Sequence, residues 1–166
     1  MGGARRRATL LREKVEELIS SLIHESHCNE HMQFGIDNED RAIMEYEFVF
    51  GEMTRPGHWI AMDGWGCTPD AFVLGENGDV GLLSAKCTML PHMMERRRSA
   101  PEPEESHYWQ CTAEMAATGL PWCDIGTYCP FMPDRSERLF TRRVERNEAD
   151  VQRMIEAISL FNRDVD

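Results

Sequence analysis

A carboxylate and an ammonium group are expected to meet at one end of a β-hairpin. The hairpin is predicted because the apolar runs 71–74 and 80–87 flank an Asn-Gly pair at 77–78, the strongest short-range signal for a tight turn. Asp70 comes directly before the first run, and Lys86 is the only charged residue of the second. A buried lysine is costly without a partner. Lys86 is therefore expected either to pair with Asp70 or to extend its amine into water at a sheet edge.

A second carboxylate is predicted to face the core from a helix. The helix spans about residues 37–50, where Asp or Asn can cap its start and a glycine follows its end. Ile43, Tyr46 and Phe50 form its apolar stripe, and Glu39 precedes Ile43 by one helical turn. Glu39 therefore projects from the side of the helix that is expected to be buried.

The other elements are predicted from apolar spacing and turn residues. Two prolines and few apolar groups indicate a mobile surface loop at residues 95–105. The pattern also predicts a helix over 8–23, a strand at 58–62, a helix over 106–118, strands at 123–129 and 138–145, and a last helix after a capping Asn147. Their order indicates one α/β or α+β domain over residues 1–166, with a helical segment at 1–34 and the core at 35–166.

The composition is that of a globular protein. Of the 166 residues, 42% are apolar and 28% are charged. No apolar run approaches the roughly 20 residues that cross a bilayer, and no apolar segment follows the basic N-terminus. We therefore expect a soluble, unexported protein with no membrane partner. Its six cysteines contain no C-x-x-C pair and are expected to be reduced thiols.

The charge is strongly acidic but unevenly distributed. The formal net charge is −11, from 18 basic and 29 acidic residues, which argues mildly against nucleic acid as a partner. Positive charge nevertheless gathers in three clusters, each of which is either solvated surface or part of a groove that follows phosphates. The clusters are Arg5, Arg6, Arg7, Arg12 and Lys14; Arg96, Arg97 and Arg98; and Arg135, Arg138, Arg142, Arg143 and Arg146.

A separate group of residues has the types and spacing of transition-metal ligands. His24, His27, Cys28 and His31 recur at i, i+3, i+4 and i+7 and would share one face of a helix. One helix rarely supplies all four ligands of a structural zinc, and packing along the first helix explains the spacing about as simply. A small zinc-stabilised interaction protein is therefore a competing hypothesis.

Several motifs in order resemble one nuclease family. Gly35-x-x-x-Glu39 is followed by Pro69-Asp70, by Lys86 after the hairpin, by Tyr108-x-Gln110 on a helix and by Val144-Glu145-Arg146-Asn147-Glu148 before the last helix. Over residues 35–161 this series resembles the phage lambda exonuclease family of PD-(D/E)-x-K nucleases. The resemblance implies an α/β fold with a restriction-endonuclease-like core, in which helices flank a central mixed sheet.

The resemblance also implies a role for each matched residue. Asp70, the carbonyl of Ala85 and Glu39 would hold Mg²⁺, with Mn²⁺ as a substitute, because such ions prefer oxygen ligands. Lys86 would orient the attacking water and stabilise the pentacoordinate phosphorane, and Gln110 would position water or substrate. The expected activity is divalent-metal-dependent digestion of double-stranded DNA from its 5′ ends, in recombination of phage type.

A 5′ exonuclease should also hold the terminal phosphate. Arginine suits this task because its planar fork matches phosphate oxygens. The candidates are Arg5, Arg6, Arg7 and Arg12, for which a solvated terminus is the alternative. The resemblance further implies a homotrimeric ring that threads DNA, a single-strand annealing protein as partner, and action in the cytoplasm of a phage-infected bacterial host.

One position departs from the family pattern. The second carboxylate of the motif belongs two residues before the lysine, and Ser84 stands there. A hydroxyl is a poor ligand for a hard divalent ion, since it removes a full charge from the coordination sphere. The site is then either weakened, or completed by another carboxylate such as Asp63, Glu76 or Asp79, or inactive in a protein that binds DNA ends or a recombination partner.

Overall fold

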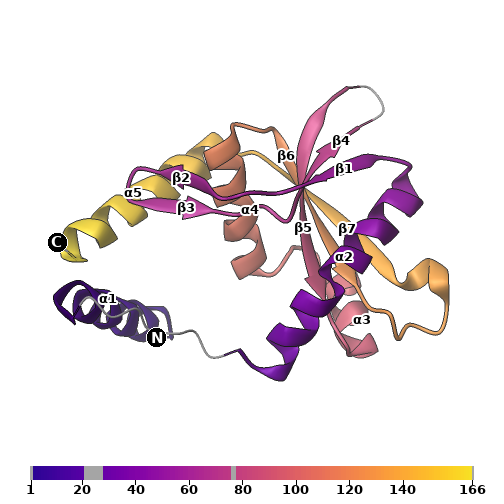
Figure 1. Ribbon diagram of the computed structural model, residues 1–166, viewed down its shortest axis with the longest axis horizontal. Helices are drawn as coiled ribbons and strands as arrows, with labels where there is room; N and C mark the ends of the chain where they lie inside the picture. The colour runs from indigo at the N-terminus through magenta and orange to yellow at the C-terminus, as the bar shows by residue number, and fades with distance from the viewer. Residues whose placement is uncertain (1, 21–27, 76–77, 166) are drawn as a thin grey trace.

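The protein is built around a five-stranded mixed sheet with helices on both faces (Figure 1). The computed structural model describes residues 2–20, 28–75 and 78–165. The strand order is β1-β4-β5-β6-β7, and only the central β5–β6 pair is parallel. The strands are β1 (Met53–Pro56), β4 (Ala71–Leu74), β5 (Val80–Cys87), β6 (Trp122–Tyr128) and β7 (Leu139–Glu145).

Two helices cover opposite faces of this sheet. Helix α2 (Glu30–Phe50) buries Tyr46 against a core cluster that includes Leu83 of β5. Helix α4 (Glu105–Thr118) buries Met115 on the other face, in a cluster that includes Leu82. Neighbouring residues of β5 thus reach different layers, as alternation along a strand requires. The fold prediction, a mixed sheet flanked by helices, is confirmed.

The remaining elements surround this three-layer body. Helix α5 (Glu148–Val165) contacts α4, and α1 (Gly2–Ser20) contacts α5 beside its C-terminal end (Figure 1). A small hairpin, β2 (Ile60–Met62) with β3 (Trp65–Cys67), contacts α4. Helix α3 (Pro91–Ser99) contacts β6, and a 3-10 turn covers Arg135–Glu137. No helix within the described ranges combines the length and the apolar character that a membrane crossing demands.

The second helix begins earlier than predicted. It starts at Glu30, because the side chain of Asn29 accepts a hydrogen bond from the backbone N–H of Met32 and caps the helix. Gly35 therefore lies inside the helix. At the other end Gly51, with φ 68°, adopts the left-handed conformation that closes helices and that glycine tolerates best.

The prediction of a mobile loop at residues 95–105 is wrong in its first half. Pro91 at the start of α3 presets the helical backbone angle, so a polar sequence still forms a helix as far as Ser99. The segment after it is tied down, since the guanidinium of Arg142 donates to the carbonyls of Ala100 and Pro101, each at 2.7 Å. Arg97 also donates to Glu104 at 2.9 Å.

Candidate active site

Asp70 and Lys86 meet at one end of the β4–β5 hairpin, as the sequence predicted. Ala71 pairs with Leu83, so Asp70 lies beside the end of β5 that carries Lys86. The Lys86 Nζ is 3.7 Å from Asp70 Oδ2, and both side chains are only about one sixth exposed. Asp70 Oδ2 also accepts a hydrogen bond from the backbone N–H of Ala85 at 2.7 Å. Burial raises the pKa of Asp70, and Lys86 and the Ala85 amide oppose this rise.

Two oxygen atoms that could hold a metal converge on the Lys86 amine. Nζ donates to the carbonyl oxygen of Ala85 at 3.2 Å and lies near Asp70 Oδ2. One carboxylate and one backbone carbonyl are hard oxygen donors of the kind that Mg²⁺ and Mn²⁺ prefer. The donor set therefore fits a hard divalent cation, and the ammonium group shows that positive charge is favourable there.

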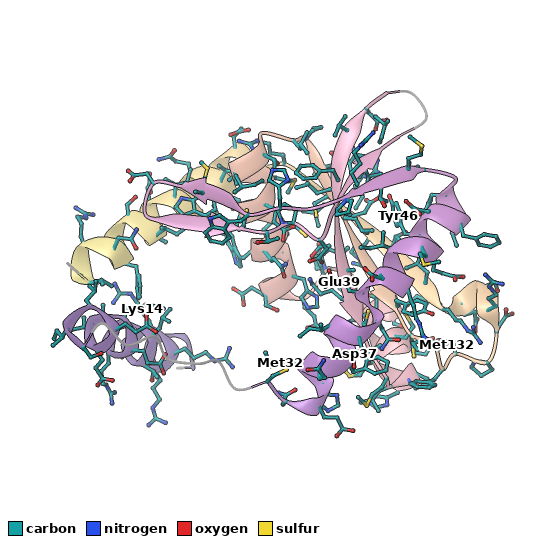
Figure 2. All side chains as sticks on the ribbon, viewed as in Figure 1. Lys14, Met32, Asp37, Glu39, Tyr46 and Met132 are labelled. Carbon is teal, nitrogen blue, oxygen red and sulfur yellow. The ribbon has the colours of Figure 1, made fainter. Side chains whose placement is uncertain are left out.

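Glu39 completes the acidic side of the site. It projects from α2 toward the middle of the molecule (Figure 2). Burial raises its pKa, the negative charge of Asp70 raises it further, and Lys86 lowers it, so both groups lie within electrostatic reach. Glu39 and Asp70 together line a cavity of about 420 Å³ between α2 and the Pro69–Asp70 segment. The predicted trio of Glu39, Asp70 and Lys86 is thus brought together by one helix and one hairpin.

Gly57 fixes the loop that carries Asp70, and the sequence analysis did not identify it. Its backbone N–H donates to the carbonyl of Asp70 at 3.1 Å. A Cβ atom added at Gly57 would lie 1.6 Å from the carbonyl oxygen of Pro69, so only glycine permits this approach. The Pro56-Gly57 pair was the available signal, since this dipeptide commonly marks a tight backbone passage.

A buried carboxylate on α4, Glu114, is the other functional candidate that the sequence analysis did not identify. Its Oε1 accepts a hydrogen bond from Gln110 Nε2 at 2.8 Å, and the residue is only 1% exposed. Burial raises the pKa of Glu114 to about 7, a rise to which the charge of Asp70 adds and which Gln110 and Lys86 oppose. Gln110 therefore holds a carboxylate that lies within electrostatic reach of the Asp70–Lys86 pair.

The departure at Ser84 lies inside this site. Ser84 is fully buried on β5, and its Oγ has no hydrogen-bond partner among the described residues. Two of the three carboxylates proposed to replace the missing one lie elsewhere: Asp63 is exposed in the β2–β3 turn, and Asp79 precedes β5 at the end opposite Lys86. Glu76 lies outside the described residues.

The arginines of the C-terminal cluster have partners within the chain, which argues against a groove that follows phosphates. The guanidinium of Arg143 donates bidentate hydrogen bonds of 2.8 and 2.9 Å to the carboxylate of the buried Asp124. It also lies over the ring of Trp122. The other four each contact groups of the chain itself: Arg135 with Glu45, Arg138 with the Met132 carbonyl, Arg142 with the loop after α3, and Arg146 with Glu148.

The N-terminal arginines lie on α1. Arg7 pairs with Asp164 of α5 and lies over the ring of Phe161. Arg5, Arg6 and Arg12 are exposed. Their role in phosphate binding remains a prediction.

The described part of the predicted helical metal group, Cys28 and His31, does not lie on one helix. His24 and His27 lie outside the described residues. Cys28 precedes the Asn29 cap of α2, whereas His31 lies inside that helix. Cys28 and His31 therefore do not share the face of one continuous helix, which removes the spacing argument for zinc.

The sheet, its two covering helices and the acid–lysine pair define the class of protein. They form a restriction-endonuclease-like core, the fold of a large group of nucleases. The chain belongs to the YqaJ-like viral recombinase domain family, whose model matches residues 3–121. No curated protein matches the chain.

Solved structures support the same assignment. The chain is similar to the alkaline exonuclease LHK-Exo from Laribacter hongkongensis, with 26% identity and a TM-score of 0.87 over 99% of this chain and 82% of that one. A structure of LHK-Exo in complex with dAMP matches with 26% identity and a TM-score of 0.83, over 96% of this chain and 79% of that one. A phage-related exonuclease from Haemophilus somnus 129PT, at 12% identity, shares the fold over 95% of this chain and 79% of its own, with a TM-score of 0.73. The chain is thus homologous to exonucleases, which supports nuclease activity.

Proposed function

We propose that this protein is a divalent-metal-dependent exonuclease that digests double-stranded DNA from its 5′ ends. The observation that carries the proposal is the convergence of Asp70 Oδ2 and the Ala85 carbonyl on Lys86, beside Glu39. These groups lie in a fold that the chain shares with exonucleases. Magnesium is the ion we propose, with manganese as a substitute.

Each residue has a part that follows from its chemistry. Asp70, the Ala85 carbonyl and Glu39 would hold the ion, which when bound supplies a more acidic water and offsets charge on the scissile phosphate. Lys86, which is 3.7 Å from Asp70, can donate a hydrogen bond to the attacking water or to a phosphate oxygen. Gln110, held by Glu114, positions water or substrate.

The wider setting is also a proposal. The whole chain would act as one nuclease domain within a homotrimeric ring and supply single strands to an annealing protein. Recombination in the cytoplasm of a phage-infected bacterium is the process that fits these parts. Exposed Arg5, Arg6 and Arg12, with Arg7 beside them, are the proposed contacts to the terminal 5′ phosphate.

The decisive experiment compares the wild type with Asp70→Asn on linear duplex DNA, with Mg²⁺, Mn²⁺ or EDTA. Cleavage should require the metal and should fall by at least about a hundredfold in the variant, because a neutral amide cannot replace a charged ligand. Wild-type and Asp70→Asn proteins should have the same thermal midpoint within a few degrees in EDTA. Cleavage in EDTA, or full activity in Asp70→Asn, would contradict the proposal. End binding without cleavage by the wild type would favour the alternative of a binding protein.

A further inference from the structure

We propose that Glu114 of α4 supplies the second carboxylate of the metal site, in place of Ser84. This inference rests on the proposed function, because it names a ligand for the ion that the nuclease would use. The site then holds three acidic groups, Glu39, Asp70 and Glu114, around one lysine.

Glu114 lies on the helix that covers the face of β5 toward which the missing carboxylate would point. Leu82, Ser84 and Lys86 point to one side of the strand, since residues two apart share a face. Leu82 packs against Met115 of α4, so that helix covers this side. Glu114 directly precedes Met115 and is buried with it.

The charges of the site act on Glu114 directly. Asp70 disfavours the ionised form of Glu114, and Lys86 favours it, so both lie within electrostatic reach of this carboxylate. Gln110 is the hydrogen-bond partner of Oε1. A buried ionised carboxylate is costly unless it is paired or coordinates a metal. A divalent ion beside Asp70 would compensate that cost and separate the two negative charges.

Ser84 gives a separate indication that a group is missing at this position. Its hydroxyl is fully buried and has no hydrogen-bond partner among the residues that the structure describes. Buried polar groups are nearly always satisfied, so an orphaned hydroxyl indicates an absent partner such as water or an ion. A small side chain on the strand and a carboxylate on the covering helix together replace one long acid on the strand.

A competing role for the same carboxylate is a site for a soft metal ion. Glu114 lies in a buried group with Cys111 and Cys123, whose ligand atoms are all within 4.8 Å of one another. The Cys123 thiol is 3.9 Å from Oε2. Two thiolates and a carboxylate would prefer Zn²⁺ to Mg²⁺. The choice between these roles can be measured, because hard and soft ions serve as separate probes.

The test is calorimetric titration of the full chain with Mn²⁺ and, separately, with Zn²⁺. Glu114→Gln should weaken Mn²⁺ binding by at least about tenfold, the scale of loss seen when metal-site groups are removed. Glu105→Gln removes the same charge from an exposed position of the same helix and should bind Mn²⁺ like the wild type. Cleavage should decrease in parallel with Mn²⁺ affinity.

A swap of the two side chains tests the location of the charge. The double variant Ser84→Glu with Glu114→Ser returns the acid to the strand at nearly constant total volume. It should bind Mn²⁺ within about threefold of the wild type. Thermal unfolding in EDTA identifies variants that fail to fold. The double variant conserves the composition of the chain. Its Mn²⁺ affinity therefore shows whether the carboxylate binds the ion even if Glu114→Gln is unstable.

The outcomes separate this inference from the proposed function. If Glu114→Gln binds Mn²⁺ like the wild type while Asp70→Asn does not, Glu114 is no ligand and the nuclease proposal stands. Loss of Zn²⁺ binding alone in Glu114→Gln, or a folded swap variant that fails to recover Mn²⁺ binding, would also overturn the inference. If Asp70→Asn binds Mn²⁺ like the wild type, the proposed ion site itself is wrong.

Discussion

At the scale of single residues, the site depends on close backbone approach as much as on charge. Asp70 is placed by two backbone contacts, the Ala85 N–H to its carboxylate and the Gly57 N–H to its carbonyl. The first contact orients the side chain, and the second fixes the loop that carries it. The carboxylate can therefore face Lys86 without searching many rotamers, which is the preorganisation that metal and phosphate sites require.

Gly57→Ala should inactivate the protein without touching any ionisable group. The added Cβ would lie 1.6 Å from the Pro69 carbonyl oxygen, so the Pro69–Asp70 segment must move. We expect a loss of about 1–3 kcal/mol in unfolding free energy, as in other overpacked sites, and a larger relative loss of cleavage. Urea unfolding and cleavage rates measure the two effects.

Gly35→Ala is the matched control for stability. It lies inside α2 with no atom within 4 Å of an added Cβ, and should gain about 0.5–1 kcal/mol from reduced backbone entropy. Normal Mn²⁺-dependent cleavage by Gly57→Ala would show that the loop position does not control the site.

At the scale of elements, the sequence predicted the helices and strands that are marked by residues within or next to them. Strand β5 has the predicted bounds, because an apolar run there is closed on one side by an Asn-Gly turn. The start of α2 was misplaced, since its first two turns bury no residue and only the Asn29 cap marks where the helix begins. Strands β1 and β3 were not predicted, because they are four and three residues long and depend on pairing with distant segments.

The residues of the candidate site show the same difference between local patterns and distant packing. Asp70 and Lys86 were predicted because one hairpin joins them, and Glu39 because helical spacing directs it to the core. Glu114 was not predicted, because its position beside β5 depends on the packing of α4 against the sheet, which no local sequence pattern indicates. Its position one helical turn after Gln110, between the apolar Cys111 and Met115, was the signal that could have identified it.

Helix α4 also carries a histidine that should make stability depend on pH. Burial, aided by the charges of Arg97 and Lys86 and opposed by Glu104, lowers the pKa of His107 to about 4 from an ordinary 6.5. The folded protein keeps this ring neutral where the unfolded chain binds a proton. Its contribution is therefore fully present above pH 6.5 and is lost as the pH falls toward 4.

The loss should approach about 2–3 kcal/mol and should be absent in His107→Gln. Urea unfolding of both proteins between pH 4 and 7.5 measures their unfolding free energies. Subtracting one from the other at each pH removes the contributions of all other titrating groups. His92→Gln, at an exposed position of α3, should follow the wild type. Parallel pH curves for the wild type and His107→Gln would exclude this assignment.

At the scale of the whole molecule, the charge distribution limits where DNA can be held. The body is acidic, with a formal net charge of −11. The C-terminal arginines serve internal contacts, as Arg143 does with Asp124. Long-range attraction of a duplex to the whole surface is therefore weak. A DNA end needs local positive groups, and exposed arginines on α1 provide them at a part of the molecule away from the sheet (Figure 1).

Helix α1 is the part whose placement decides the 5′-phosphate prediction. Arg7 fastens it to α5 through Asp164 and Phe161, which leaves Arg5, Arg6 and Arg12 exposed along the same helix. We expect the wild type to cleave 5′-phosphorylated duplex faster than 5′-hydroxyl duplex. Changing these three arginines to Gln should reduce that preference by at least about tenfold, since charge-assisted bonds contribute about 1.5–3 kcal/mol.

The measurement compares initial cleavage rates on the two substrates at one fixed salt concentration. A control triple variant at Arg135, Arg153 and Arg163, all exposed, changes the net charge equally and should keep the wild-type preference. This control matters because removal of any positive charge weakens DNA binding in a salt-dependent way. Equal cleavage rates of the wild type on the two substrates would remove the basis for assigning α1 to DNA ends. An equal loss in both triple variants would instead assign the effect to net charge, because only a local contact distinguishes arginines on α1 from those elsewhere.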